Sequence, residues 1–185
     1  LGGIPHYLKQ FNSNDTLENN IIKNILTKGT ILFDEVDYLI HQELREPAVY
    51  NSILEAIAAG CNTFTEIIDH SKIDSQKITV YLKNLIELGI IKKEFPIQTS
   101  IKTKSNNSKG EYIINDNLFN FYYKYIFPYM GEYELEKINI LWQSLIKNDL
   151  HNFASKTFEN VCIKYLYQLS SKNQLPSIFL NIGRW

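Results

Sequence analysis

The stretch DSQKITVYLKNLIELGIIKKEFPI, residues 74–97, joins a helical pattern to a short apolar and basic segment. Ile78, Leu82 and Leu85 recur at spacings of three and four residues, which predicts one buried face of an amphipathic helix. Two interpretations are open from this pattern alone. The helix and its basic tail contact DNA, or the helix is an ordinary amphipathic one that leads into a surface hairpin.

The residues around this stretch complete a recognisable order of elements. Thr63 and Glu66 stand at capping-box spacing before a short helix, and a turn at Lys72 and Ile73 leads into the helix that starts at Asp74. Downstream, IIKKEFPI and EYIIN are strand candidates that flank the polar loop QTSIKTKSNNSKG. Two helices followed by a hairpin with a long basic tip predict a winged helix-turn-helix.

Helical periodicity dominates the remainder of the chain. It predicts a short helix at 4–11, a helix after the capping-box pair Asp15 and Glu18, and helices over 32–44 and from Pro47 to Gly60. Beyond residue 116 it predicts an aromatic-rich helix, a longer one around 135–145 and another around 158–169. The fold class is therefore mainly α, with a winged helix-turn-helix flanked by helical segments.

If the apolar stripe of the 74–88 helix faces the core, its other side presents side chains that can reach phosphates and base edges in a major groove. The expected contacts on this helix are Ser75, Gln76, Lys77, Thr79, Lys83 and Asn84. Those on the hairpin are Lys92, Lys93, Lys102 and Lys104. Duplex DNA is thus the partner that the pattern suggests, with lysines on phosphate and Gln76 and Thr79 at bases.

The positive charge of residues 72–110 is consistent with a surface that binds a polyanion, but other interpretations are open. Residues 72–110 contain eight basic and three acidic side chains, a net charge of +5, whereas the whole chain has a net charge of -1. A lysine-rich loop is also common as a solvated hairpin tip, and winged helices also serve as packing or interaction modules. A protein-binding or oligomerisation role is the alternative to DNA binding.

The aromatic run that ends near Tyr129 has two interpretations as well. Aromatic side chains stack on the bases of single-stranded nucleic acids, but aromatics on every face of one helix are typical of a helix buried between two layers. The second interpretation is the prediction. The run consists of Phe119, Phe121, Tyr122, Tyr123, Tyr125, Phe127 and Tyr129.

Composition indicates a soluble, folded protein. Hydrophobic residues make up 44% and charged residues 21% of the 185 residues, and no apolar run is long enough to span a bilayer. The two distant cysteines favour reduced thiols and hence a cytoplasmic location. Because the chain begins at Leu1 and its single methionine is Met130, we expect it to be part of a longer protein.

The search for catalytic motifs is negative. No glycine is followed by lysine anywhere in the sequence, so the chain has no P-loop of its own. His6, His41, His70 and His151 stand singly, without the converging ligands that a metal site needs. No nucleophile-elbow pattern occurs either, so we expect neither catalysis nor a metal site within these residues.

The order of segments resembles the C-terminal half of archaeal-type AAA-like P-loop ATPases. The matching segments are GGIPHYL, LFDEVDYLIHQELREPAVYNSILEAIAAG, the winged helix, YIINDNLFNFYYKYIFP, FENVCIKYL and LPSIFLNIGRW. The resemblance implies that residues 1–46 are the remainder of a helical lid and that 47–115 are the winged helix-turn-helix. Residues 116–185 would then be the helical start of a truncated domain that is similar to PD-(D/E)xK nucleases.

The resemblance also implies site residues and partners. Gly3, Ile4 and Pro5 match the G-x-P element near the adenine in similar ATPases, and Pro5 is the residue expected there. ATP and magnesium are expected for the parent protein, not for this chain. Glu159 matches the first acidic position of the nuclease-like domain, but the rest of that pattern would lie beyond Trp185. The parent's ATPase domain and a second copy of the chain are the other expected partners.

Overall fold

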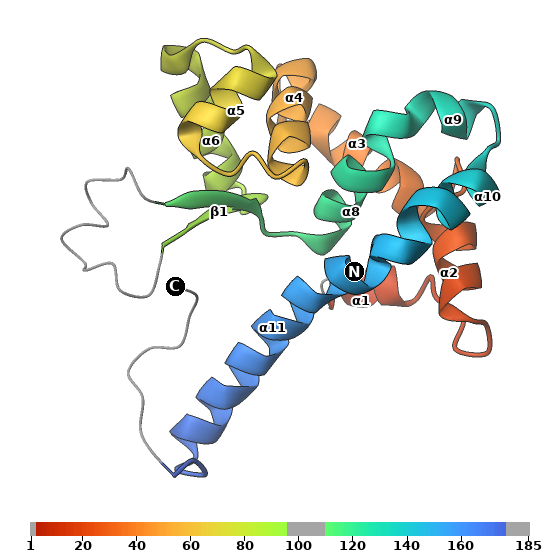
Figure 1. The fold of residues 1–185 in the computed structure, drawn as a ribbon, viewed down its shortest axis with the longest axis vertical. Coiled ribbons are helices and arrows are strands. Elements are labelled where there is room, and N and C mark those ends of the chain that lie inside the picture. The colour runs from red at the N-terminus through yellow and green to blue at the C-terminus, as the bar shows by residue number, and fades with distance from the viewer. Residues whose placement is uncertain (1–2, 96–109, 177–185) are drawn as a thin grey trace.

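The structure is a computed structural model of the chain that describes residues 3–95 and 110–176. Before the hairpin lie α1 (Pro5–Leu8), α2 (Leu17–Asn24), α3 (Ile31–Glu43), α4 (Pro47–Ala58), α5 (Phe64–Ser71) and α6 (Ser75–Glu87). The hairpin strands are β1 (Ile91–Glu94) and β2 (Glu111–Ile114). They are followed by α8 (Asn117–Tyr125), η1 (Phe127–Tyr129), α9 (Met130–Glu134), α10 (Ile138–Leu141), η2 (Trp142–Ile146) and α11 (Lys147–Ser171). The predicted mainly helical fold with a small hairpin is confirmed (Figure 1).

Helices α4, α5 and α6 form a three-helix unit at one end of the molecule (Figure 1). The Thr63 side chain accepts from the Glu66 N–H and the Glu66 carboxylate accepts from the Thr63 N–H, which confirms the predicted capping box. Lys72 takes a left-handed conformation, with φ of 57°, and turns the chain into α6, whose N-cap is Asp74. The predicted apolar stripe of α6 is buried.

The hairpin continues directly from α6. Strands β1 and β2 pair antiparallel, with Ile91 opposite Ile114 and Glu94 opposite Glu111. The N–H of Tyr112 also donates to the carbonyl of Asn62 at 2.7 Å, which attaches β2 to the segment between α4 and α5. Three helices followed by a paired hairpin give the order of a winged helix-turn-helix.

Helix α8 is buried as predicted for the aromatic run. Tyr122, Tyr123 and Tyr125 expose at most 2% of their surface, and α8 packs against both α3 and α4. The Tyr123 hydroxyl donates to the Asn51 side-chain oxygen at 2.6 Å, so its polar tip is satisfied inside the core. Aromatic residues here serve as core rather than as a base-stacking platform.

One hydrophobic core runs through all three segments of the predicted division. It extends from Tyr7 through α3, α4 and the three-helix unit to Ile146. The segments on either side of residues 46 and 115 therefore share one core. The division into lid, winged helix and nuclease-like segments at these residues stays a prediction. Helix α8 packs on α4, and α6 contacts α4 through the Asn84–Tyr50 hydrogen bond and the Tyr50–Tyr81 ring contact.

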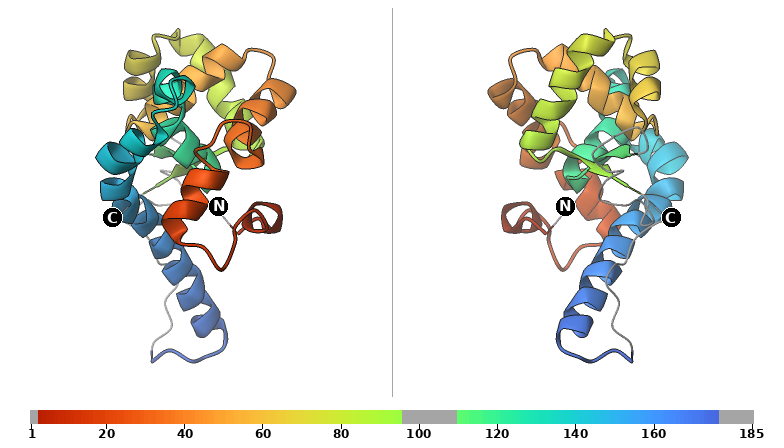
Figure 2. Two further views of the ribbon diagram at one scale, coloured as in Figure 1. Left: turned by 90° about the vertical axis from the view of Figure 1, so that its right-hand side faces the viewer. Right: turned by 90° about the vertical axis from the view of Figure 1, so that its left-hand side faces the viewer.

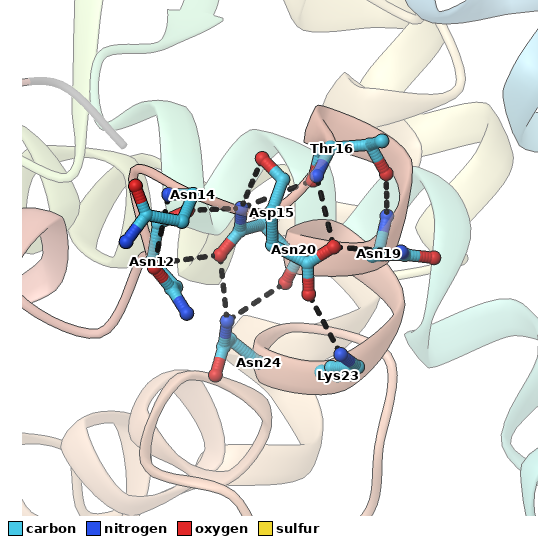
Figure 3. Close-up of polar contacts among 8 residues, drawn as sticks. All are labelled: Asn12, Asn14, Asp15, Thr16, Asn19, Asn20, Lys23 and Asn24. Atoms are coloured by element: carbon cyan, nitrogen blue, oxygen red, sulfur yellow. Dashed lines mark hydrogen bonds and ion pairs between the residues drawn. The ribbon is translucent and has the colours of Figure 1, made fainter.

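Helix α2 begins one residue later than the predicted capping box. Thr16, not Asp15, is the N-cap and accepts from the Asn19 N–H, while Asp15 forms an ion pair with Lys23 at 2.7 Å. Figure 3 shows Asn20 at the centre of this network. Its buried side chain accepts from the Asn12 N–H and donates to three carbonyls, which holds the 12–16 loop against α2. A local cap pattern could not show that an amide from α2 satisfies this loop.

The two predicted helices near the C-terminus are joined in the structure. The backbone stays helical from Ile138 to Ser171, with a π-helical turn at Trp142–Ile146. Figures 1 and 2 show α11 projecting away from the rest of the molecule. Phe153 stacks edge-on against Phe121, and the Tyr125 hydroxyl donates to Asp149 at 2.7 Å, so the first half of α11 is anchored on α8.

We predict that Ile78→Ala lowers the free energy of unfolding by about 2–5 kcal/mol, because Ile78 is fully buried in the three-helix unit and the substitution leaves a cavity. Val80→Ala is the matched control on the same helix, since Val80 is 57% exposed; its effect should stay within about 0.5 kcal/mol. Urea unfolding followed by circular dichroism measures both. Equal destabilisation by the two substitutions would contradict the observed orientation of α6.

A second prediction concerns pH. The ammonium of Lys124, aided by the Tyr125 hydroxyl, lowers the pKa of Asp149 below the ordinary value of 3.8. A carboxyl with a lowered pKa in the folded state stabilises the fold above pH 3.8, and its contribution is lost as pH falls through the folded pKa. Asp149→Asn should therefore be less stable than the natural chain near neutral pH by about 1 kcal/mol, since the pair is partly exposed.

The difference between Asp149→Asn and the natural chain should shrink as the solution is acidified through the folded pKa. Urea unfolding at several pH values from neutral to acid measures the change. Asp69→Asn on the exposed side of α5 is the control for removal of one carboxylate, and its stability near neutral pH should stay within about 0.5 kcal/mol of the natural chain. A deficit of Asp149→Asn that persisted unchanged in acid would argue against the ion pair.

Candidate nucleic-acid interface

The outer side of α6 presents most of the side chains that the sequence predicted. Ser75, Gln76, Lys77, Thr79 and Lys83 are all exposed, because burial of the opposite stripe fixes the rotation of the helix. Val80 is also exposed on α6, so the surface is mixed rather than purely polar. Five of the six predicted positions on α6 thus reach solvent.

Asn84 differs from that prediction. Its side chain is half-buried and donates to the Tyr50 hydroxyl at 2.8 Å. Tyr50 stacks edge-on against Tyr81 at 5.0 Å, and the Tyr81 hydroxyl donates to the Glu46 carboxylate, whose proximity raises the pKa of Tyr81. Asn84 therefore belongs to a polar cluster that holds α6 against the start of α4.

A groove of about 770 Å³ lies between α6 and the turn that joins α3 to α4. Lys77 and Arg45 line it, but so do three carboxylates, Glu43, Glu46 and Glu87. The carboxylates would repel phosphates on this side of α6. Sequence reasoning omitted Arg45, because its place beside α6 depends on the packing of distant segments rather than on any local pattern.

Two lysines on α6 and the hairpin form ion pairs with neighbouring carboxylates. The Lys83 ammonium lies 3.6 Å from Glu87, one turn along the helix, in an exposed pair of small strength. Lys92 pairs with Glu94 at 2.7 Å. In the described part of the chain Lys77 forms no ion pair, although it lines the groove together with three carboxylates.

Lys93 is directed to aromatic neighbours. Its ammonium lies 4.6 Å from the centre of the Tyr112 ring and donates to the Tyr112 hydroxyl at 3.3 Å. Lys93 is half-buried, and these contacts with Tyr112 join β1 to β2. Lys102 and Lys104 lie outside the described residues, so their predicted positions on the hairpin tip stay predictions.

The described residues provide little for a nucleotide or a metal. Pro5 is the exposed first residue of the four-residue helix α1, where proline is favoured for its fixed φ. Residues 3–95 and 110–176 contain no group of three or more metal-ligating side chains. The role of Pro5 near an adenine of the parent stays a prediction, and Glu159 is an exposed residue of α11. No helix among these residues is both long and apolar enough to cross a membrane.

Comparison with known proteins connects the chain to proteins of unknown function. Residues 122–185 match the family DUF234, described as archaea bacterial proteins of unknown function. An uncharacterised protein of Methanocaldococcus jannaschii is 39% identical over 183 residues, which are 99% of this chain and 40% of that protein. No solved structure matches the chain. The chain thus spans less than half the length of this curated relative, and its part from within α8 onward is similar to DUF234.

Proposed function

We propose that the chain binds duplex DNA through α6 and the β1–β2 hairpin. The observation that carries this proposal is the exposed outer side of α6, held in a fixed rotation by its buried stripe. A helix presented in this way, preceded by a tight turn and followed by a hairpin, has the geometry that places side chains in a major groove.

The exposed side chains divide into two roles in this proposal. Lys77 and Lys83 contact phosphates, which supplies affinity and orientation but no sequence information. Gln76 and Thr79 lie near the start of α6 and have the donors and acceptors that base edges require, with Ser75 beside them. Lys92, together with Lys102 and Lys104 from the segment of sequence between β1 and β2, would contact phosphates of the neighbouring DNA strand.

We further propose that the chain is the C-terminal part of an archaeal-type AAA-like ATPase. Support comes from the resemblance of the ordered segments and from the relative, which is much longer than this chain. ATP and magnesium would bind the parent's P-loop domain, and this chain would transmit its state without catalysing a reaction. Pro5 would lie near the adenine in the parent, as the resemblance to the G-x-P element implies.

A second role, as an interaction module, has its own support. Glu43, Glu46 and Glu87 line the groove beside α6, and the Lys83 and Lys92 charges are paired with carboxylates. These features weaken the attraction for phosphate that the lysine count suggests. In this alternative the groove contacts another protein domain and no DNA is bound.

The DNA proposal predicts salt-dependent binding that is sensitive to two α6 lysines. A labelled duplex titrated by fluorescence anisotropy should bind with an affinity that falls steeply as salt rises. Lys77→Ala combined with Lys83→Ala should weaken binding and make the slope of log affinity against log salt shallower by about 2, or about 1 per lost phosphate contact.

The matched control combines Lys156→Ala with Lys164→Ala on α11, which removes the same charge from exposed positions remote from α6. It should leave both the affinity and the salt slope unchanged. Absence of binding at low salt, or equal loss in the two double variants, would refute contact through α6 and favour the interaction module.

A further inference from the structure

Val80 is an exposed aliphatic residue on the side of α6 that is proposed to bind DNA. Its side chain is 57% exposed, although valine is normally buried. With a rotation of about 100° per residue, Gln76 and Val80 both lie within about 20° of the direction opposite the buried Ile78. Val80 is therefore placed to meet a ligand of α6 and not to pack in the core.

Gln76 lies one turn before Val80 on the same side of α6. It is exposed, and among the described residues its side-chain amide forms no hydrogen bond. A free amide offers a donor and an acceptor together, which matches the N7 and N6 positions of adenine in the major groove. Thr79 differs, because its hydroxyl donates to the Ser75 carbonyl at 3.1 Å. Gln76 is thus the side chain of this surface that can pair with an adenine edge.

We propose that α6 reads a site that contains A·T base pairs, in which Gln76 pairs with an adenine and Val80 packs on the 5-methyl group of a thymine. Among the four bases, thymine alone exposes a methyl group in the major groove, and apolar side-chain groups recognise it. Gln76 and Val80 are separated by about 6 Å along the helix axis, and base pairs are stacked roughly 3.4 Å apart, so the two residues reach nearby base pairs. This inference rests on the proposed function and names the class of DNA sequence that the same surface prefers.

The charges around Gln76 and Val80 fit contact with a duplex at the start of α6. The first turn of α6 contains no acidic residue, and the N-cap carboxylate of Asp74 is engaged by the Gln76 N–H at 2.9 Å. Glu87 is paired with Lys83 and lies about 16 Å further along the helix axis than Gln76, beyond the bases that the first two turns would reach. Arginine, a frequent reader of guanine, is absent from α6.

Val80 also lies at the edge of the groove beside α6. It lines this groove together with Lys77, whereas Gln76 does not. An exposed valine at the edge of a groove would also suit a protein partner. The two occupants differ in a way that can be measured, because only DNA carries the thymine methyl group.

Three hairpin duplexes of equal length test the inference by fluorescence anisotropy at low salt. The first has alternating A·T pairs, the second has deoxyuridine in place of every thymidine, and the third has alternating G·C pairs. An alternating A·T sequence offers a thymine methyl group at every base pair, so the register of binding need not be known. The natural chain should bind the uracil duplex roughly four-fold more weakly than the thymine duplex, as loss of one buried methyl group predicts. It should bind the G·C duplex roughly ten-fold more weakly or worse, because Gln76 loses its adenine.

Two variants and a matched control assign these differences to side chains. Val80→Ser should bind the thymine and uracil duplexes with equal affinity, and it should fold because the position is exposed and the two residues have similar helix propensities. Gln76→Ala should lose most of the preference for A·T over G·C and keep the difference between thymine and uracil. Ile86→Ser is the control, since Ile86 is 40% exposed on another side of α6 and its substitution should leave both preferences unchanged. Circular dichroism verifies that all three variants fold.

Equal binding of the thymine and uracil duplexes by the natural chain would overturn the inference. A uracil effect that persisted in Val80→Ser would also overturn it, because the effect would then come from the shape of the duplex. A preference for the G·C duplex would do the same. Each of these results includes DNA binding and so leaves the proposed function intact. Absence of binding to all three duplexes would refute the proposed function and this inference together, and it would favour a protein partner at Val80.

Discussion

Burial of the α8 aromatic side chains is the interaction on which the arrangement of the whole molecule depends. Tyr122, Tyr123 and Tyr125 are buried because α8 packs against α3 and α4, and Tyr125 also contacts Phe153 at the base of α11. Rings of this size bury more apolar surface than any aliphatic side chain, so they contribute heavily to the stability of the core. Burial also raises the pKa of Tyr123 and Tyr125, and both hydroxyls stay protonated and donate to Asn51 and Asp149.

The same packing fixes the orientation of the proposed DNA-binding surface. Helix α4 contacts α8 on one side and α5 and β2 on another, so it connects the core to the three-helix unit. The cluster of Tyr50, Tyr81 and Asn84 then fixes α6 against α4. A ligand of α6 would therefore meet a preorganised helix rather than one that has to be ordered on binding, which reduces the entropic cost of association.

The distribution of charge in three dimensions is more balanced than the +5 of residues 72–110 implies. Glu87 and Glu94 accompany Lys83 and Lys92, and Lys93 rests on an aromatic ring. The groove next to α6 is partly acidic although Lys77 lines it, whereas Gln76, Thr79 and Lys83 lie outside the groove. Because of this division, we propose DNA contact on the outer side of α6. The carboxylates of the groove support the interaction-module alternative. Helix α11 lies apart from this surface, because it projects away from the three-helix unit (Figure 1).

Local sequence determined the elements that depend on short-range chemistry. The Thr63–Glu66 capping box, the buried stripe of α6 and the antiparallel hairpin all rest on patterns within a few residues, and the structure contains each of them. The sequence also predicted that the aromatic run lies in the core, because a helix with rings on all sides can bury them only when other elements cover it on all sides. Five of the six predicted α6 contacts face solvent for the same periodic reason.

Tertiary structure alone decided the features that depend on distant partners. Asn84 is half-buried because its side chain donates to the hydroxyl of Tyr50 on another helix. The Asn20 side chain donates to carbonyls of the 12–16 loop, which lie close to it in the folded chain. Thr16 is the N-cap in place of the predicted Asp15, and Asp15 instead pairs with Lys23. The continuous helix from Ile138 to Ser171, and the exposure of its apolar stripe, likewise could not be read locally, since periodicity indicates an apolar side but not what covers it. Local sequence determines which helices and strands form and which side of each is apolar. Long-range packing determines which polar groups are hydrogen-bonded to distant residues and which apolar sides are covered.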